Sequence, residues 1–217
     1  MFQNRREAGE KLAKKLAEIP FTNPVVIALP RGGVEVAIPI AQKLKAPLDL
    51  LFVKKLGAPN EPELAIGAVA ESGLLFINRD LAIRLGISEE WLQQIGKEKI
   101  QEIARQRDSL KLESVPVEGR DVILIDDGVA TGATLYLAIQ SLAREYPKSI
   151  TVGVPVAPAE GGVLEMLKEV SNRLVVLETH TPFFAVSRWY YSFPQLTTGK
   201  VKEMLRQTNL FKGQNSI

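Results

Sequence analysis

The stretch from Val122 to Thr134, VILIDDGVATGAT, holds the residue types and spacing that could do chemistry. Asp126 and Asp127 follow four apolar residues, where a buried strand would end and where open α/β sheets bind ligands. The residues that follow are small or carry hydroxyl groups, and a helix should begin among them. Free N–H groups at a helix start attract anions. The segment therefore predicts a phosphate cradle built from Ala130, Thr131, Gly132, Ala133 and Thr134.

The acidic pair narrows the choice of ligand. Carboxylates repel phosphate, but they accept hydrogen bonds from vicinal hydroxyls and can hold hydrated Mg²⁺. A ribose 5-phosphate carries both a diol and a phosphate, so it suits Asp126, Asp127 and the cradle together. No GxxxxGK[ST] pattern occurs in the chain, which disfavours a P-loop nucleotide hydrolase.

Alternating strands and helices must position these residues. Short apolar runs predict buried strands, and stretches with apolar residues at helical spacing predict the helices between them. Such alternation favours an α/β fold with a parallel sheet. Two β-like runs joined through Ser72 and Gly73 predict a hairpin, and Ser88 is expected to cap a long helix. Strands are expected at 25–29, 47–53, 122–125, 149–156 and 173–177, with helices at 6–19, 34–44, 89–108, 132–146 and 159–170.

VILIDDGVATGAT resembles the phosphoribosyl pyrophosphate (PRPP) binding motif of type I phosphoribosyltransferases. Val53–Gly73 and Pro182–Tyr190 extend the similarity to a broad group of predicted phosphoribosyltransferases. The resemblance implies the type I fold, a mostly parallel twisted sheet with helices on both faces plus a small hood. It also implies that Asp126 and Asp127 act in catalysis by contacting the ribose hydroxyls, directly or as ligands of Mg²⁺, and that residues 130–134 wrap the 5-phosphate.

The same resemblance implies a pyrophosphate site. Arg31 and Gly32, in the loop after the first strand, would grip pyrophosphate, with a non-proline cis peptide bond between them. Further cations are expected from Lys54 and Lys55 at the end of the second strand, and from Arg105 and Arg107. A mobile lid should exclude water, with two candidate segments, 57–64 and 105–118. The second is favoured because it carries basic residues.

Aromatic residues gather in the segment that begins at Thr181. Trp189 or Tyr190 is predicted to stack on a planar acceptor. Core packing or a subunit interface would explain the same aromatic residues and stays open. His180 lies near the expected acceptor position, although a lone histidine is more often structural.

The amino-acid composition argues against several other kinds of functional site and partner. The chain has 217 residues, a formal net charge of +2, no cysteine and one histidine. Disulfides, cysteine–zinc sites, thiol nucleophiles and multi-histidine metal sites are therefore excluded. No basic stripe is evident in the sequence, which disfavours nucleic acid as a partner. No apolar stretch is long enough for a membrane span, and the polar start is unlike a secretory signal, so a cytoplasmic location is expected.

We expect one domain over 1–217, with a core at about 21–180 and with the helix at 4–19 and the tail at 181–217 as possible hood. The predicted activity is transfer of ribose 5-phosphate from PRPP to a nitrogen acceptor, with Mg²⁺ as cofactor, in a homodimer. A regulatory protein that binds PRPP or a nucleotide without turnover is the alternative.

Overall fold

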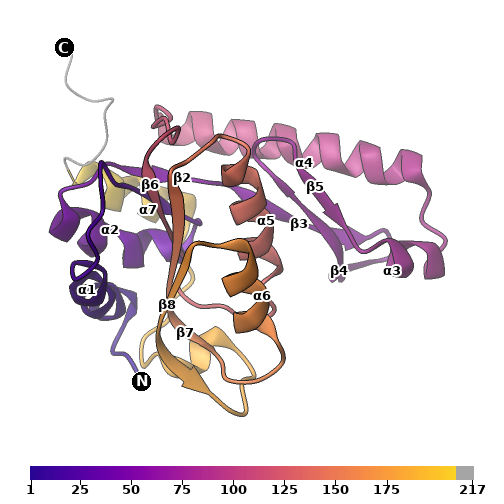
Figure 1. The fold of residues 1–217 in the computed structure, drawn as a ribbon. Coiled ribbons are helices and arrows are strands. Elements are labelled where there is room, and N and C mark those ends of the chain that lie inside the picture. The colour runs from indigo at the N-terminus through magenta and orange to yellow at the C-terminus, as the bar shows by residue number, and fades with distance from the viewer. Residues whose placement is uncertain (209–217) are drawn as a thin grey trace.

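The computed structural model describes residues 1–208. Its centre is a parallel sheet with the strand order β2–β1–β6–β7–β8 (Figure 1). All residues of β1 and β6 are buried, which agrees with the continuous apolar runs at 25–28 and 122–125. The bounds are β1 Val25–Ala28, β2 Leu48–Leu50, β6 Asp121–Ile125, β7 Ser149–Pro158 and β8 Arg173–His180.

Helices cover both faces of this sheet, as expected. One face carries α1 (Arg5–Leu16) and α2 (Gly32–Leu44), and the other carries α5 (Ala133–Ala143) and α6 (Val163–Val170) (Figure 1). The helix predicted at 4–19 as possible hood is α1. It packs instead on α2 and the sheet, because Ala8, Leu12 and Leu16 form a fully buried stripe along it.

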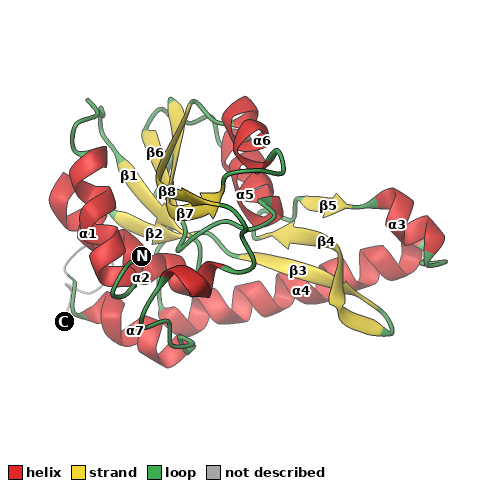
Figure 2. Cartoon of the chain, turned by 90° about the horizontal axis from the view of Figure 1, so that it is seen from below, coloured by secondary structure: helices red, strands yellow, loops and turns green. Residues whose placement is uncertain are grey.

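A second, antiparallel sheet lies between β2 and β6 in the sequence. It contains β3 (Val53–Ala58), β4 (Glu61–Ala70) and β5 (Leu75–Ile77), and it is followed by α3 (Arg79–Arg84) and α4 (Glu89–Leu110). We call residues 53–110 the arm. Figure 1 and Figure 2 show the arm reaching away from the parallel sheet, with α4 along its length.

The arm confirms two predictions and corrects one. The hairpin through Ser72 and Gly73 joins β4 to β5, and the Ser88 hydroxyl caps α4 by accepting a 3.2 Å hydrogen bond from the Trp91 N–H. The second central strand, however, ends at Leu50, and the residues predicted to close it belong to β3. The favoured lid segment at 105–118 begins in the last turns of α4, which ends at Leu110, close to the helix end expected at 108, and closure by this segment stays a prediction.

The segment after β8 crosses the carboxyl edge of the sheet and includes the short helix η1 (Val186–Trp189). We call residues 181–196 the hood segment. Phe2 pairs with Tyr190 in an isolated bridge, which ties the start of the chain to this segment. The predicted hood is shorter than 181–217, since α7 (Thr198–Arg206) packs on α2 and α4, with Val201 and Leu205 in the main core. Its last part, 209–217, lies outside the described residues.

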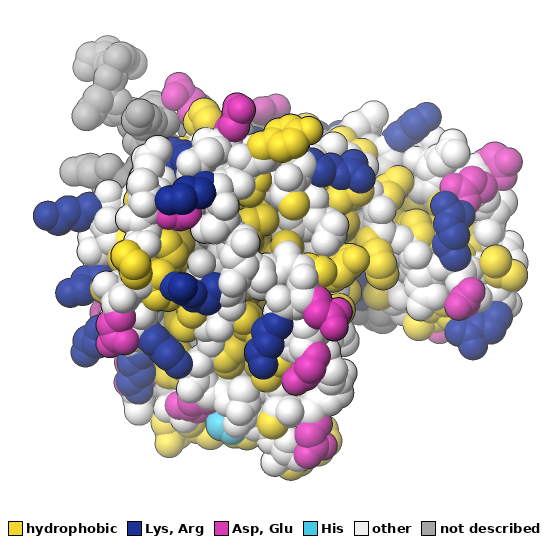
Figure 3. Space-filling view, viewed as in Figure 1, with side chains coloured by type: hydrophobic (Ala, Val, Ile, Leu, Met, Phe, Trp, Pro, Cys, Tyr) yellow, Lys and Arg dark blue, Asp and Glu magenta, His cyan; other side chains and the backbone are white. Residues whose placement is uncertain are grey.

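Within residues 1–208, no helix combines the length and apolar character that a membrane span needs. On the face drawn in Figure 3, acidic side chains are interspersed among the basic ones, and no continuous basic stripe is formed.

Candidate functional site

The acidic pair lies at the carboxyl end of β6, between β1 and β7. The backbone N–H of Asp127 donates a 2.8 Å hydrogen bond to Asp126 Oδ1, which fixes the first carboxylate against the chain. Gly128 follows, and a Cβ atom there would lie 2.5 Å from the side chain of Val186 in the hood segment. The hood segment therefore closes directly over the acidic end of the strand.

The loop after β1 packs against this pair. The Leu29 N–H donates to the Ile125 carbonyl at 2.9 Å, so β1 and β6 stay paired to the sheet edge. A Cβ atom on Gly32 would overlap the carboxylate of Asp127, and one on Gly33 would lie 2.8 Å from the Ile125 oxygen. Glycine is required here by close approach of the two loops.

Arg31 and Gly32 are therefore beside Asp126 and Asp127, and Arg31 is exposed. The structure has its non-proline cis peptide bond between Pro30 and Arg31, one residue before the position expected from the resemblance.

The predicted phosphate cradle is the start of α5. Gly132 precedes the helix in a left-handed conformation, with φ of +77°, and no side chain caps the helix. The first turn of α5 contains no acidic residue. Uncapped N–H groups and the positive end of the helix dipole suit an anion, and the exposed positions leave room for one. These exposed positions are Ala130, Thr131, Ala133 and Thr134.

The two carboxylates are electrostatically unfavourable without a ligand. Burial, reinforced by the negative charge of Asp127, raises the pKa of Asp126 well above its usual value. Burial also raises the pKa of Asp127, while the hydrogen bond and positive charge of Arg5 oppose that rise. A cation or hydroxyl donor placed between the acids would relieve this cost.

The donor set fits magnesium. Mg²⁺ prefers oxygen ligands and is usually held by one or two carboxylates together with water and substrate oxygens. Asp126 and Asp127 would supply the carboxylates. Within the described chain no group of three or more His, Asp or Glu side chains could hold a metal alone, so the remaining ligands would have to come from substrate or water.

Sequence reasoning missed Arg5. It begins α1, is 5% exposed, and its Nε donates a 2.7 Å hydrogen bond to Asp127 Oδ2. An arginine among the charged residues at the start of a surface helix carries no sequence signal for such a contact. Only the packing of α1 and the hood segment around the acidic loop brings it there.

Two of the other predicted cations, Lys54 and Arg107, are engaged in ion pairs away from the acidic pair. Lys54 forms a 3.1 Å ion pair with Glu102 of α4. Arg107 is ion-paired with Asp49 and Glu71 and also donates to the Leu50 carbonyl, so its guanidinium joins α4 to β2 and the hairpin. Arg105 is exposed on α4. A pyrophosphate contact from Lys54, Lys55 or Arg105 stays a prediction. The guanidinium of Arg107 already donates to Glu71, Asp49 and the Leu50 carbonyl, so it is not available to pyrophosphate.

The predicted acceptor platform needs a similar correction. The ring of Tyr190 is buried between Phe2 and Phe193, and its hydroxyl donates a 2.6 Å hydrogen bond to the Asp127 carbonyl. Trp189 stacks on His180, with ring centroids 3.4 Å apart. The buried ring of Tyr190 cannot stack on a base, and the indole face of Trp189 that packs on His180 is not available to one.

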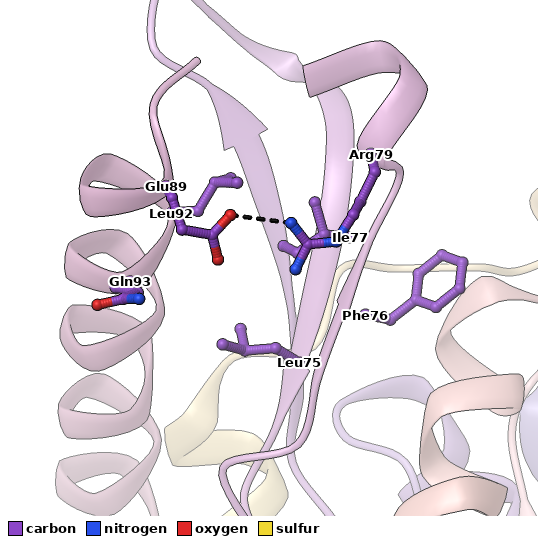
Figure 4. Close-up of a pocket in the computed structure, with 7 residues that line it drawn as sticks. All are labelled: Leu75, Phe76, Ile77, Arg79, Glu89, Leu92 and Gln93. Atoms are coloured by element: carbon purple, nitrogen blue, oxygen red, sulfur yellow. Dashed lines mark hydrogen bonds and ion pairs between the residues drawn. The ribbon is translucent and has the colours of Figure 1, made fainter. Parts of the chain in front are cut away.

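A cavity of about 310 Å³ lies away from this site, between β5 and the start of α4. Figure 4 shows Leu75 and Ile77 directed toward α4, Phe76 on the opposite side of the strand, and Arg79 paired with Glu89 across the opening. Its walls are mainly apolar, with no set of donors that would hold a phosphate.

Three comparisons place the chain among known proteins. Residues 2–183 match the model of the phosphoribosyl transferase domain family. A Mycobacterium tuberculosis protein, whose name places it among the phosphoribosyl transferases, is 34% identical over 207 residues, which is 94% of this chain and 46% of that protein. The chain thus spans about half the length of this relative. The Thermus thermophilus protein TT1426 has a crystal structure that matches with a TM-score of 0.79 and 36% identity, over 95% of this chain and 98% of TT1426.

The parallel sheet with its acidic loop, the glycine-rich loop packed against it and the family match over most of the chain agree with one another. The parallel sheet with helices on both faces confirms the predicted α/β architecture, and the family match shows that the chain belongs to the phosphoribosyl transferase family.

Proposed function

We propose that the protein transfers the ribose 5-phosphate of PRPP to a nitrogen atom of a small acceptor and releases pyrophosphate. One observation carries this proposal. The acidic pair, the uncapped start of α5 and the Arg31–Gly32 loop meet at a single edge of the parallel sheet. A sugar diol, a monophosphate and a pyrophosphate are the groups that such neighbours would bind.

In the proposed reaction the acceptor nitrogen forms a bond to C1 of the ribose as the bond from C1 to pyrophosphate oxygen breaks. The electron pair leaves with pyrophosphate. Asp126 and Asp127 would hold the ring hydroxyls, the start of α5 would hold the 5-phosphate, and Arg31 would stabilise the departing anion. Bound Mg²⁺ would supply further charge compensation for pyrophosphate.

The hood segment would bound the acceptor side. Val186 contacts Gly128 beside the acidic pair, and Phe184, two residues earlier, is 78% exposed. Phe184 is therefore an available ring in that segment, and we propose it in place of Trp189 and Tyr190 as the surface on which a planar acceptor stacks.

The experiment is an incubation with PRPP, Mg²⁺ and a panel of nucleobases and amines, with pyrophosphate release as the readout. Release that depends on an acceptor supports the transferase. Calorimetric binding of PRPP without release for any acceptor would instead favour the regulatory alternative. No binding at all would remove both.

The first prediction concerns Asp127. Asp127→Asn keeps the shape of the side chain but removes the charge that would hold the diol, so turnover should fall to background. Asp108→Asn, which changes an exposed carboxylate on α4, is the matched control and should leave turnover unchanged. Full activity in Asp127→Asn with a native circular dichroism spectrum would refute the site assignment.

A further inference from the structure

Arg5 is a buried charge in contact with the proposed sugar site. Its side chain is 6% exposed, and its guanidinium contacts Asp127, Pro194 and Phe193. Nε donates to Asp127 Oδ2 at 2.7 Å, and Nη1 donates to the Pro194 carbonyl at 2.9 Å. The planar group also lies 3.6 Å from the centre of the Phe193 ring. Glu35 approaches Nη1 at 4.0 Å.

These contacts constrain Asp127 from one side only. Its Oδ2 is held by Arg5, whereas Oδ1 has no hydrogen bond to another residue in the described part of the chain. Gly32 packs against the same carboxylate, because any side chain at that position would overlap it. The carboxylate is therefore fixed in orientation with one oxygen left for a ligand.

The hood segment holds the same residue by a second route. Tyr190 donates its hydroxyl to the Asp127 main-chain carbonyl at 2.6 Å, and Phe193 and Pro194 hold the guanidinium that grips the side chain. Both backbone and carboxylate of Asp127 are thus set by residues 190–194, with Arg5 as the link to the carboxylate.

We propose that Arg5 is a positioning residue for PRPP, which orients the Asp127 carboxylate toward the ribose diol and balances its charge. The inference rests on the proposed function only as far as PRPP binding, and not on turnover. A purely structural arginine would join α1 to the hood segment and affect folding stability, with no effect on ligand affinity in the folded protein.

The test measures PRPP affinity by calorimetry in the presence of Mg²⁺, and thermal unfolding without ligand, on the full chain. Arg5→Met keeps the aliphatic length and removes both charge and donors. Loss of a partner that orients a metal-ligating side chain typically costs about 10- to 100-fold in metal affinity or activity, and we expect PRPP affinity in the presence of Mg²⁺ to fall by a factor in that range. Arg6→Met is the matched control, because Arg6 is exposed and, among residues 1–208, forms an ion pair with Glu10 on the surface. It should bind PRPP as the wild type does.

Arg5→Lys provides the rescue. Lysine restores the charge but not the planar fork that reaches Asp127 and Pro194 while lying over Phe193, so its affinity should fall between those of the wild type and Arg5→Met. If Arg5→Met does not fold, Arg5→Lys compared with the wild type decides the matter. Wild-type affinity in a folded Arg5 variant, with only the melting temperature lowered, would overturn the inference.

The outcomes separate this inference from the proposed function. PRPP binding that depends on Arg5, without pyrophosphate release for any acceptor, would support the inference and refute the reaction. If the wild type turns over and Arg5→Met binds PRPP as tightly as the wild type does, the reaction is supported and the inference about Arg5 is refuted. A wild-type protein that binds no PRPP refutes both.

Discussion

At the scale of single residues, the site is built at the expense of stability. Asp126 and Asp127 are adjacent carboxylates that are largely withdrawn from water, and only Arg5 makes an ion pair with either of them in the described structure. If the pair binds a ligand as proposed, like charges stay close to each other until that ligand arrives. The raised pKa of Asp126 reflects the unfavourable free energy of burying its charge beside that of Asp127.

This leads to a prediction for Asp126→Asn. The pKa of Asp126 is higher in the folded protein than the value of about 3.9 expected for an unfolded chain. The free energy of unfolding therefore falls as pH rises from the unfolded-state pKa of Asp126 to its higher folded-state pKa, because the unfolded chain gives up its proton more readily. Asparagine mimics the protonated acid, so the variant should be about 0.5 to 2 kcal/mol more stable at neutral pH.

The measurement is urea unfolding of both proteins across pH. The advantage of Asp126→Asn should shrink as pH falls, since the wild-type carboxyl becomes protonated. PRPP binding should be lost in the same variant. A variant less stable than the wild type at neutral pH would contradict the assignment of strain to this pair.

At the scale of elements, the arm is joined to the central sheet by Arg107. Its guanidinium bridges the buried Asp49 of β2 and Glu71 beside the hairpin. Glu145, after α5, lies near the same acids, and burial together with the charges of Glu71 and Asp49 raises its pKa. Arg107 is thus the cation that balances an acidic junction between the arm and the sheet.

Arg107→Met should destabilise the fold strongly. Removal of the guanidinium leaves Asp49 buried without its ion-pair partner, and breaking a buried pair typically costs about 3–5 kcal/mol. Arg105→Met, two residues earlier and exposed, should change the free energy of unfolding by less than about 0.5 kcal/mol. Denaturant titration of both variants is the check, and similar losses in the two would refute the junction role.

At the scale of the whole molecule, the proposed sugar site draws on distant parts of the chain. Arg5 belongs to the first helix, Gly32 to the start of α2, Asp127 to the loop after β6 and Tyr190 to the hood segment. A ligand that bridges these segments binds only when they are assembled. Binding of such a ligand should therefore stabilise the folded state of the whole chain.

Addition of PRPP with Mg²⁺ should raise the melting temperature. At a ligand concentration about 100 times Kd the stabilisation is about 2.7 kcal/mol, which for a chain of this size corresponds to a shift of about 5–10 °C. Chelation of Mg²⁺ should remove most of the shift, because the acidic pair then faces pyrophosphate without a cation between them. Differential scanning fluorimetry measures both effects. A shift of equal size with chelator present would argue against a metal at Asp126 and Asp127.

The sequence by itself determined the secondary structure of those segments whose conformation depends on residues close together in the chain. The apolar run before Asp126, the small residues after it and the start of α5 form one continuous segment, so its strand, loop and helix could be predicted together. The hairpin through Ser72 and Gly73 and the cap at Ser88 are local for the same reason.

Tertiary structure decided which charges and rings meet. Arg5 reaches Asp127 across 122 positions of the chain, Arg107 turns inward to Asp49, and Tyr190 is buried under Phe2 instead of facing an acceptor. A charged or aromatic residue on an amphipathic segment looks the same in sequence whether it faces solvent, a ligand or another element. Its partner is fixed only when helices and loops pack on the sheet, because burial makes an unpaired charge too costly to keep.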